Sequence, residues 1–76
     1  MDSNILDAKG LLCPLPVLKA RKALKALAPG ETLEVLATDP GAVKDFAAFC
    51  RTTVHLLVES TEAAGTFRFL IRKNGI

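Results

Sequence analysis

The sequence contains little cysteine and histidine, with only Cys13, Cys50 and His55 among 76 residues. A small secreted domain held together by disulfides would carry more cysteines, so a disulfide framework is excluded. Three such residues at this spacing also lack the close pairs and the number of ligands that a zinc site requires. We therefore expect no metal, and nothing in the sequence requires an organic cofactor.

Long apolar runs and a signal sequence are also missing. No apolar run approaches the roughly 20 residues that a membrane-spanning helix needs. The first ten residues, MDSNILDAKG, lack the basic segment and apolar run of a secretory signal. We therefore expect a cytoplasmic protein without membrane contacts. A net charge of +2 is weak for a nucleic-acid-binding domain, so direct nucleic-acid binding is not expected.

The chain is short enough for one domain, residues 1–76, and half of its residues are hydrophobic. Strands are predicted at 4–8, 31–38, 54–61 and 66–73, and helices at 14–30 and 39–52. The last two strands form a hairpin around the turn at 62–65. This order, βαβαββ, predicts an α/β two-layer sandwich with a four-stranded mixed sheet and both helices on one face.

A thiol lies directly before the first predicted helix, in the stretch GLLCPLPVLKARKAL. With Pro14 as the first helical residue, Cys13 lies at or just before the N-cap, where the helix dipole favours an anion. The dipole is expected to lower the pKa of Cys13 towards about 7, which suits a thiol that attacks sulfur. Pro14 and Pro16 stiffen the first turn. The alternative is a structural cysteine that happens to lie near a helix start.

Different roles are predicted for the other polar candidates, which are Cys50, His55 and Asp39. Cys50 falls on the apolar face of the second helix and is predicted to lie in the core, roughly 16 Å from the edge that carries Cys13, so the two should not form a disulfide. His55 begins its strand at the opposite edge of the sheet and is predicted to be structural or to face a partner. Asp39 is the predicted N-cap of the second helix, with Pro40 in its first turn. Asp39 should lie beside Cys13, where it could also contribute to a partner site.

The first helix has two unlike faces. Val17, Ala20, Leu24 and Leu27 form the predicted core stripe. The other side carries Leu15, Leu18, Arg21, Lys22 and Lys25, and the helix contains no acidic residue. This side is predicted to bind an acidic, partly apolar partner protein. The alternative is an ordinary solvated face whose cations favour the C-terminal half of the helix.

The stretch LDAKGLLCPLPVLKARKAL, followed by PGETLEVLATDPGAVKDFAAFC and FLIRK, resembles the TusA family of sulfur-carrier proteins, also called SirA-like. The resemblance covers residues 5–73. It depends on the combination of a CPxP motif at 13–16 with Gly10 before it and Asp39-Pro40 after it. A CPxP motif alone would be weak.

The resemblance implies that Cys13 accepts sulfane sulfur from a donor protein, often a cysteine desulfurase, and holds it as a persulfide. The sulfur then passes to a cysteine of an acceptor protein, in pathways such as tRNA 2-thiouridine formation, molybdenum-cofactor maturation or sulfur-compound metabolism. It implies a sulfurtransferase with little independent turnover, and we expect a monomer. Leu15 departs from the acidic residue that members acting in tRNA thiolation often carry.

Two other functions can be compared with the sequence. A thioredoxin-like oxidoreductase would show Cys-x-x-Cys, but position 16 is proline. A non-catalytic protein- or RNA-binding regulatory module would use the basic face of the first helix and would not need Cys13, and the fold alone does not distinguish it from a sulfur carrier.

Overall fold

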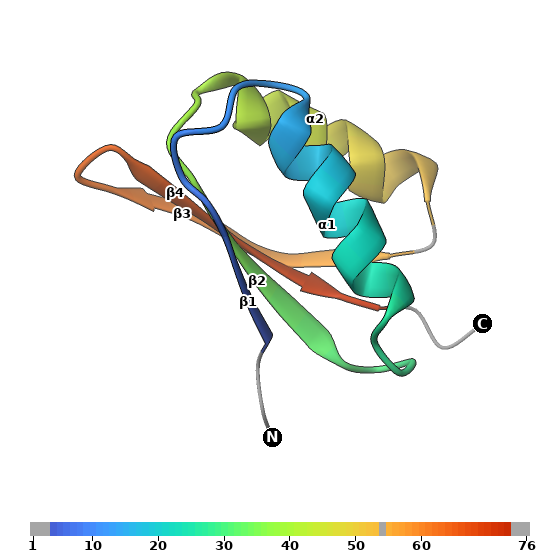
Figure 1. Ribbon diagram of the computed structural model, residues 1–76. Coiled ribbons are helices and arrows are strands. Elements are labelled where there is room, and N and C mark those ends of the chain that lie inside the picture. The colour runs from blue at the N-terminus through green and yellow to red at the C-terminus, as the bar shows by residue number, and fades with distance from the viewer. Residues whose placement is uncertain (1–3, 54, 74–76) are drawn as a thin grey trace.

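Strands and helices alternate along the chain as far as Thr52, and a hairpin of two strands follows. The computed structural model describes residues 4–53 and 55–73. The elements are β1 (Asn4–Ala8), α1 (Leu15–Lys25), β2 (Thr32–Ala37), α2 (Gly41–Thr52), β3 (Leu56–Ala63) and β4 (Thr66–Arg72). Both helices cover the same face of the sheet, as Figure 1 shows. The predicted βαβαββ two-layer sandwich is confirmed.

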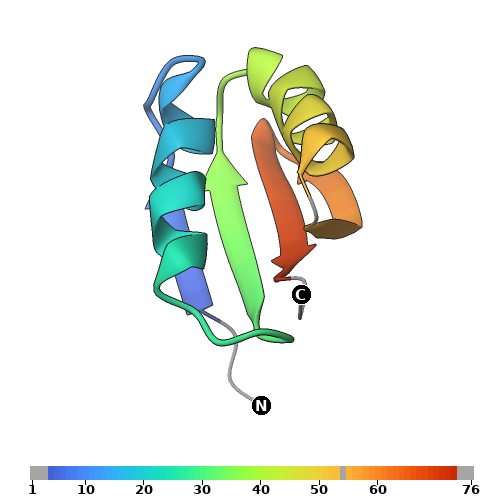
Figure 2. The ribbon, with the colours of Figure 1, turned by 90° about the vertical axis from the view of Figure 1, so that its right-hand side faces the viewer.

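The sheet has the order β1-β2-β4-β3. Strand β1 pairs in parallel with β2, whereas β4 runs antiparallel to both β2 and β3. A parallel pair needs a crossover, and α1 supplies it. As a result, the carboxyl ends of β1 and β2 lie at one edge of the sheet, and α1 and α2 both start there (Figure 2).

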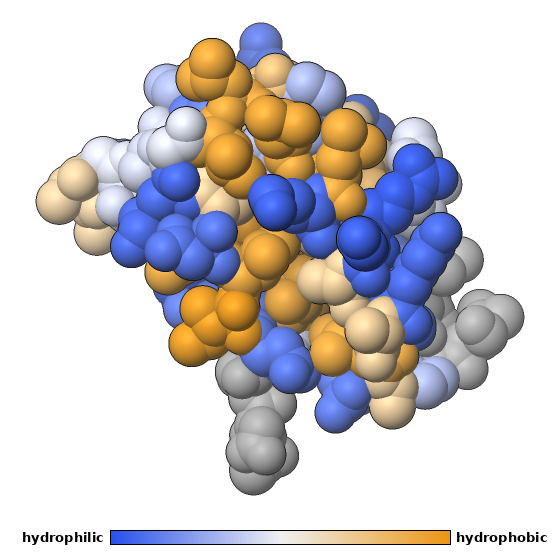
Figure 3. Space-filling view, viewed as in Figure 1, coloured by the Kyte–Doolittle hydropathy of each residue, from blue (hydrophilic) through white to orange (hydrophobic). Residues whose placement is uncertain are grey.

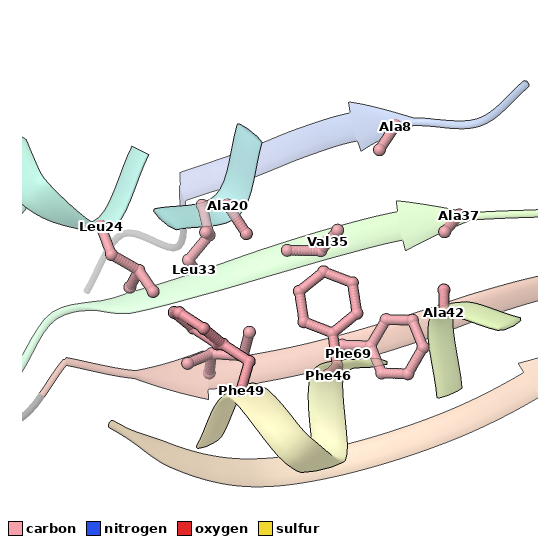
Figure 4. Close-up of a cluster of buried hydrophobic side chains, with 11 residues drawn as sticks. Ala8, Ala20, Leu24, Leu33, Val35, Ala37, Ala42, Phe46, Phe49 and Phe69 are labelled. Carbon is pink, nitrogen blue, oxygen red and sulfur yellow. The ribbon is translucent and has the colours of Figure 1, made fainter. Parts of the chain in front are cut away.

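Alternation along β2 directs one set of side chains into the core. Leu33, Val35 and Ala37 are buried on the helix-facing side, and Phe69 and Ile71 of β4 lie beside them in the register. The rings of Phe46 in α2 and Phe69 in β4 stack with their centroids 4.5 Å apart (Figure 4). The helices add further buried side chains: Pro16, Ala20 and Leu24 from α1, and Ala42, Phe46 and Phe49 from α2.

The other face of the sheet is not covered by a helix and carries an ion-pair network. Arg68 of β4 lies 2.9 Å from the carboxylate of Glu34 in β2 and 2.9 Å from that of Glu59 in β3. One guanidinium therefore connects three adjacent strands. Strand β3 adds little to the core, because Leu57 is its one residue that is not exposed among those described.

The helix boundaries differ from the predicted ones. Helix α1 starts at Leu15, with Pro14 at the N-cap, and ends at Lys25 because the next two N–H groups bond carbonyls three residues back. Helix α2 starts at Gly41, so Pro40 takes the N-cap position predicted for Asp39. At 11 and 12 residues, neither is long enough to cross a membrane, and no helix in the described ranges is both long and apolar enough to do so.

The hairpin turn is also shorter than predicted. The strands continue to Ala63 and resume at Thr66, leaving Ala64 and Gly65 as a two-residue loop with φ values of 52° and 84°. Two consecutive positive φ angles match the twist of the flanking strands. The predicted turn at 62–65 therefore contains this loop but starts two residues too early, because Glu62 and Ala63 still belong to β3.

The stacked ring pair gives a stability prediction. Replacing Phe46 with alanine should lower the free energy of unfolding by about 3–5 kcal/mol, because it leaves a cavity against Phe69. Urea denaturation followed by circular dichroism measures this loss. The matched control on the same helix is Val43→Ala, since Val43 is 40% exposed, and it should change the value by less than about 0.5 kcal/mol. Equal losses would contradict this assignment of the core.

Candidate functional site

Cys13 lies in the segment between β1 and α1, at the sheet edge where both helices start. Its thiol is free and exposed. A Cβ atom placed on Gly41, the first residue of α2, would lie 3.5 Å from the Cβ of Cys13. The cysteine therefore adjoins the start of the second helix as well as that of the first. The sequence predicted this position at the common edge.

The loop that carries Cys13 is fixed by main-chain geometry. Gly10 has a φ of +84°, a conformation that favours glycine, and its N–H donates to the Thr38 hydroxyl at 3.0 Å. This bond connects the loop after β1 to the segment after β2. Leu11 closes the turn with an N–H bond of 3.2 Å to the carbonyl of Ala8.

Asp39 connects the same loop to α2. One carboxylate oxygen accepts the main-chain N–H of Cys13 at 2.6 Å, and the other accepts the N–H of Gly41 at 3.2 Å. The residue is not the N-cap by position, but its side chain still bonds an N–H in the first turn. The expectation that Asp39 lies beside Cys13 is confirmed by these contacts.

Asp45 of α2 accepts a hydrogen bond from the Cys13 thiol. This bond is the main cause of a raised pKa at Cys13, and desolvation and the negative charges of Asp45 and Asp39 act in the same direction. The prediction that the helix start lowers this pKa is therefore wrong. A carboxylate in direct contact outweighs the partial charges of a helix end.

Sequence reasoning missed Asp45 altogether. The sequence contains only a weak indication that Asp45 lies near the thiol. Asp45 follows Gly41 by four residues, so it lies one turn farther along the same side of α2. Since the start of α2 was placed at the edge that carries Cys13, that spacing could have indicated a carboxylate near the thiol.

The two prolines have different environments. Pro14 is exposed and precedes the first helical residue, and the Cys13–Pro14 peptide bond is cis. Pro16 is buried under the first turn of α1. Its contribution to the site is therefore packing beneath the turn, whereas Pro14 lies at the surface beside the thiol.

Exposed apolar side chains occur on the loop that carries the thiol and in the first turns of both helices that start beside it. Leu12 in the loop, Leu15 and Leu18 in α1 and Val43 in α2 are 70%, 46%, 51% and 40% exposed. We refer to these four residues as the apolar patch. Figure 3 shows hydrophobic side chains gathered over the starts of α1 and α2. Large side chains clustered in this way around a reactive group are typical of a protein-binding surface.

Farther along α1 the exposed face becomes basic. Arg21, Lys22 and Lys25 are all exposed, as predicted for the face that carries Leu15 and Leu18. We refer to these three residues as the basic patch. The predicted core stripe is also confirmed: Ala20 and Leu24 are buried, and Val17 and Leu27 pack against the core.

The remaining candidates lie apart from the thiol. Cys50 is free, is half-buried against the core, and has a pKa raised by that burial. His55 precedes β3 at the opposite edge of the sheet, where its ring lies 5.8 Å from that of Phe49, and burial lowers its pKa. Within the described ranges, no three metal-ligating side chains come together.

The geometry of this site can be compared with known proteins. Residues 4–73 match the family model described as Sulfurtransferase TusA. The chain belongs to the TusA family. It is 56% identical over 69 residues to a Sulfur carrier protein TusA of Allochromatium vinosum, a match that covers 91% of each chain. It is 50% identical to a putative sulfur carrier protein of Neisseria meningitidis serogroup A, covering 95% of this chain and 97% of the relative.

A solved structure supports the membership. The crystal structure of a SirA-like protein from Desulfitobacterium hafniense superposes with a TM-score of 0.81 at 25% identity, covering 92% of this chain and 96% of that one. Both the family resemblance and the two-layer fold predicted from the sequence are therefore confirmed.

The contact between Asp45 and the thiol predicts a pH effect. Asp45→Asn removes the charged acceptor and its negative charge, so the pKa of Cys13 should fall. The ultraviolet absorbance of the thiolate, titrated with pH after subtraction of the Cys13→Ser spectrum, measures this pKa directly. A pKa that stays constant or rises in Asp45→Asn would show that the carboxylate does not control the thiol.

Proposed function

We propose that this protein is a sulfur carrier whose Cys13 accepts sulfane sulfur as a persulfide and passes it to a thiol of an acceptor protein. The observation that carries the proposal is a free, exposed thiol at the common start of two helices, within a chain of the TusA family. Relatives at 56% and 49% identity are named as sulfur carriers, which supports the same role here.

The chemistry needs only one cysteine of this chain. Sγ of Cys13 forms a bond to the outer sulfur of a donor persulfide, and the bond between that sulfur and the donor cysteine breaks, leaving the donor as a thiol. The second transfer repeats the step in the other direction, with the acceptor thiol attacking the outer sulfur on Cys13. The transferred sulfur keeps its oxidation state throughout, so the cycle requires no external oxidant or reductant.

The surroundings of Cys13 favour a protein over a small molecule as partner. The thiol is exposed and bordered by the apolar patch, which suits contact with another protein surface. The basic patch on α1 would attract an acidic donor, such as a cysteine desulfurase with an acidic docking surface, or an acidic acceptor. A sulfurtransferase of this kind acts as an intermediate between partners and has little turnover alone.

Sulfur loading tests the proposal. The reduced protein, incubated with a cysteine desulfurase and cysteine, or separately with thiosulfate, should gain one sulfur atom that reductant removes. Peptide mass spectrometry should map it to Cys13. Cys13→Ser should gain none, whereas Cys50→Ser, the matched control at the half-buried cysteine, should load as the unchanged protein does. Loading of Cys50 alone, or equal loading of Cys13→Ser, would reject the carrier role of Cys13.

Charge reversal separates the carrier from a binding module that uses only the basic patch. In a carrier, Lys22→Glu should slow loading by a protein donor, and added salt should reduce the difference. Arg72→Glu is the matched control, because it makes the same charge change on the exposed part of β4. If a Cys13→Ser protein keeps full function in cells and Lys22→Glu abolishes it, the binding module is correct instead.

A further inference from the structure

The proton of the Cys13 thiol has a defined acceptor in the resting protein. The thiol lies in the loop before α1, and Asp45, which accepts its hydrogen bond, comes from α2, 32 residues later in the chain. Asp39, the other nearby carboxylate, has both oxygens occupied by main-chain N–H groups. Of the two carboxylates, only Asp45 therefore bonds the reacting sulfur itself.

We propose that Asp45 is a catalytic residue that takes the proton of Cys13 as its sulfur attacks the donor persulfide. The inference rests on the proposed carrier function and deepens it. As the new sulfur–sulfur bond forms, the donor cysteine leaves with the electron pair of the broken bond, and the Cys13 proton moves to the Asp45 carboxylate. That proton then passes to the departing thiolate, which restores the ionised carboxylate and balances the step.

Other groups are less suited to this task. His55, the one histidine, lies at the opposite edge of the sheet. The charged groups that face Cys13 are Asp39, before α2, and Asp45, within it. Helix α1 contributes only cations, and its loop adds Lys9, which pairs with Asp7. Because both nearby carboxylates raise the pKa of the thiol, they disfavour the thiolate, and a bonded proton acceptor removes the need for it.

The pH dependence distinguishes a proton acceptor from a mere negative charge. If Asp45 takes the proton, uptake by the unchanged protein does not depend on a preformed thiolate. The Asp45→Asn protein must then react through the thiolate of Cys13. The fraction of Cys13 present as thiolate falls about tenfold for each pH unit below an ordinary thiol pKa of about 8.5. If Asp45 only raises the thiol pKa, both proteins react as thiolates, and their rate ratio becomes constant at low pH.

The experiment measures sulfur uptake from glutathione persulfide, a donor that needs no docking. Initial rates for the unchanged protein and Asp45→Asn are followed by intact mass at several values between about pH 6 and pH 8. Ionisation of the donor cancels in the ratio of the two rates. We expect this ratio to exceed one at the acid end and to rise about tenfold for each unit by which the pH falls.

Three further variants complete the design. Asp39→Asn removes a charge at the same site while its amide oxygen can still accept the Cys13 N–H, so the rate ratio of the unchanged protein to Asp39→Asn should not vary with pH. Asp45→Glu retains a carboxylate, so the rate ratio of the unchanged protein to Asp45→Glu should also stay constant with pH. Asp45→Ala, at a half-buried helix position, repeats the measurement if Asp45→Asn does not give the native circular dichroism spectrum.

The outcomes separate the two proposals. A ratio of unchanged protein to Asp45→Asn that is below one and constant with pH overturns the role of Asp45 and leaves the carrier function in place. An unchanged protein that gains no sulfur on Cys13, from this donor or from a desulfurase, overturns the carrier function and the role of Asp45 together.

Discussion

The site depends on one carboxylate that binds main-chain groups of two elements at once. Asp39 accepts the N–H of Cys13 from the loop before α1 and the N–H of Gly41 at the start of α2. Without this bridge the loop would be attached to its neighbours through two bonds, from Gly10 to Thr38 and from the Cys13 thiol to Asp45. The parallel pairing of β1 and β2 brings these segments to one edge, and Asp39 then sets how the thiol is presented there.

The local charge at this edge is the reverse of what the helix starts alone would give. Two helix N-termini favour an anion, but two carboxylates occupy the same position, and Asp45 bonds the thiol directly. Both carboxylates therefore favour the neutral thiol of Cys13 over the thiolate in the free protein. A neutral, exposed thiol is less prone to oxidation than a thiolate, which suits a carrier that must remain reduced until a donor arrives.

The fold was predictable because its signals are local and agree with one another. The alternation of Leu33, Val35 and Ala37 and the stripe of Val17, Ala20, Leu24 and Leu27 both place the correct side in the core. The common edge for Cys13 and Asp39 followed from topology alone. Helix ends and the hairpin turn were displaced by one to a few residues, because final turns and positive φ angles depend on individual hydrogen bonds.

The chemistry of the site was less predictable than its position. The pKa of Cys13 depends on Asp45, a residue 32 positions away whose contact with the thiol arises only when α2 packs beside the loop. Sequence periodicity identifies faces of helices, but it does not identify which polar side chain on one element meets a given atom of another. The direction predicted for the pKa shift of Cys13 was therefore wrong. Both carboxylates that raise this pKa, Asp39 and Asp45, nevertheless lie within the segment predicted as the second helix.

The small contribution of β3 to the core affects how the molecule moves. Its one described side chain that is not exposed is Leu57. The strand is otherwise held by contacts with α2, by the ladder to β4 and by the ion pair between Glu59 and Arg68. Strands β1, β2 and β4 together with both helices hold the buried side chains. Opening of β3 would therefore expose little apolar surface, and it should occur at a lower free energy than global unfolding. Strand β3 lies at the side of the sheet opposite β1, and the hydrogen bonds of Cys13 come from Asp39 and Asp45 rather than from β3, so fluctuations of β3 can take place while Cys13 remains in position.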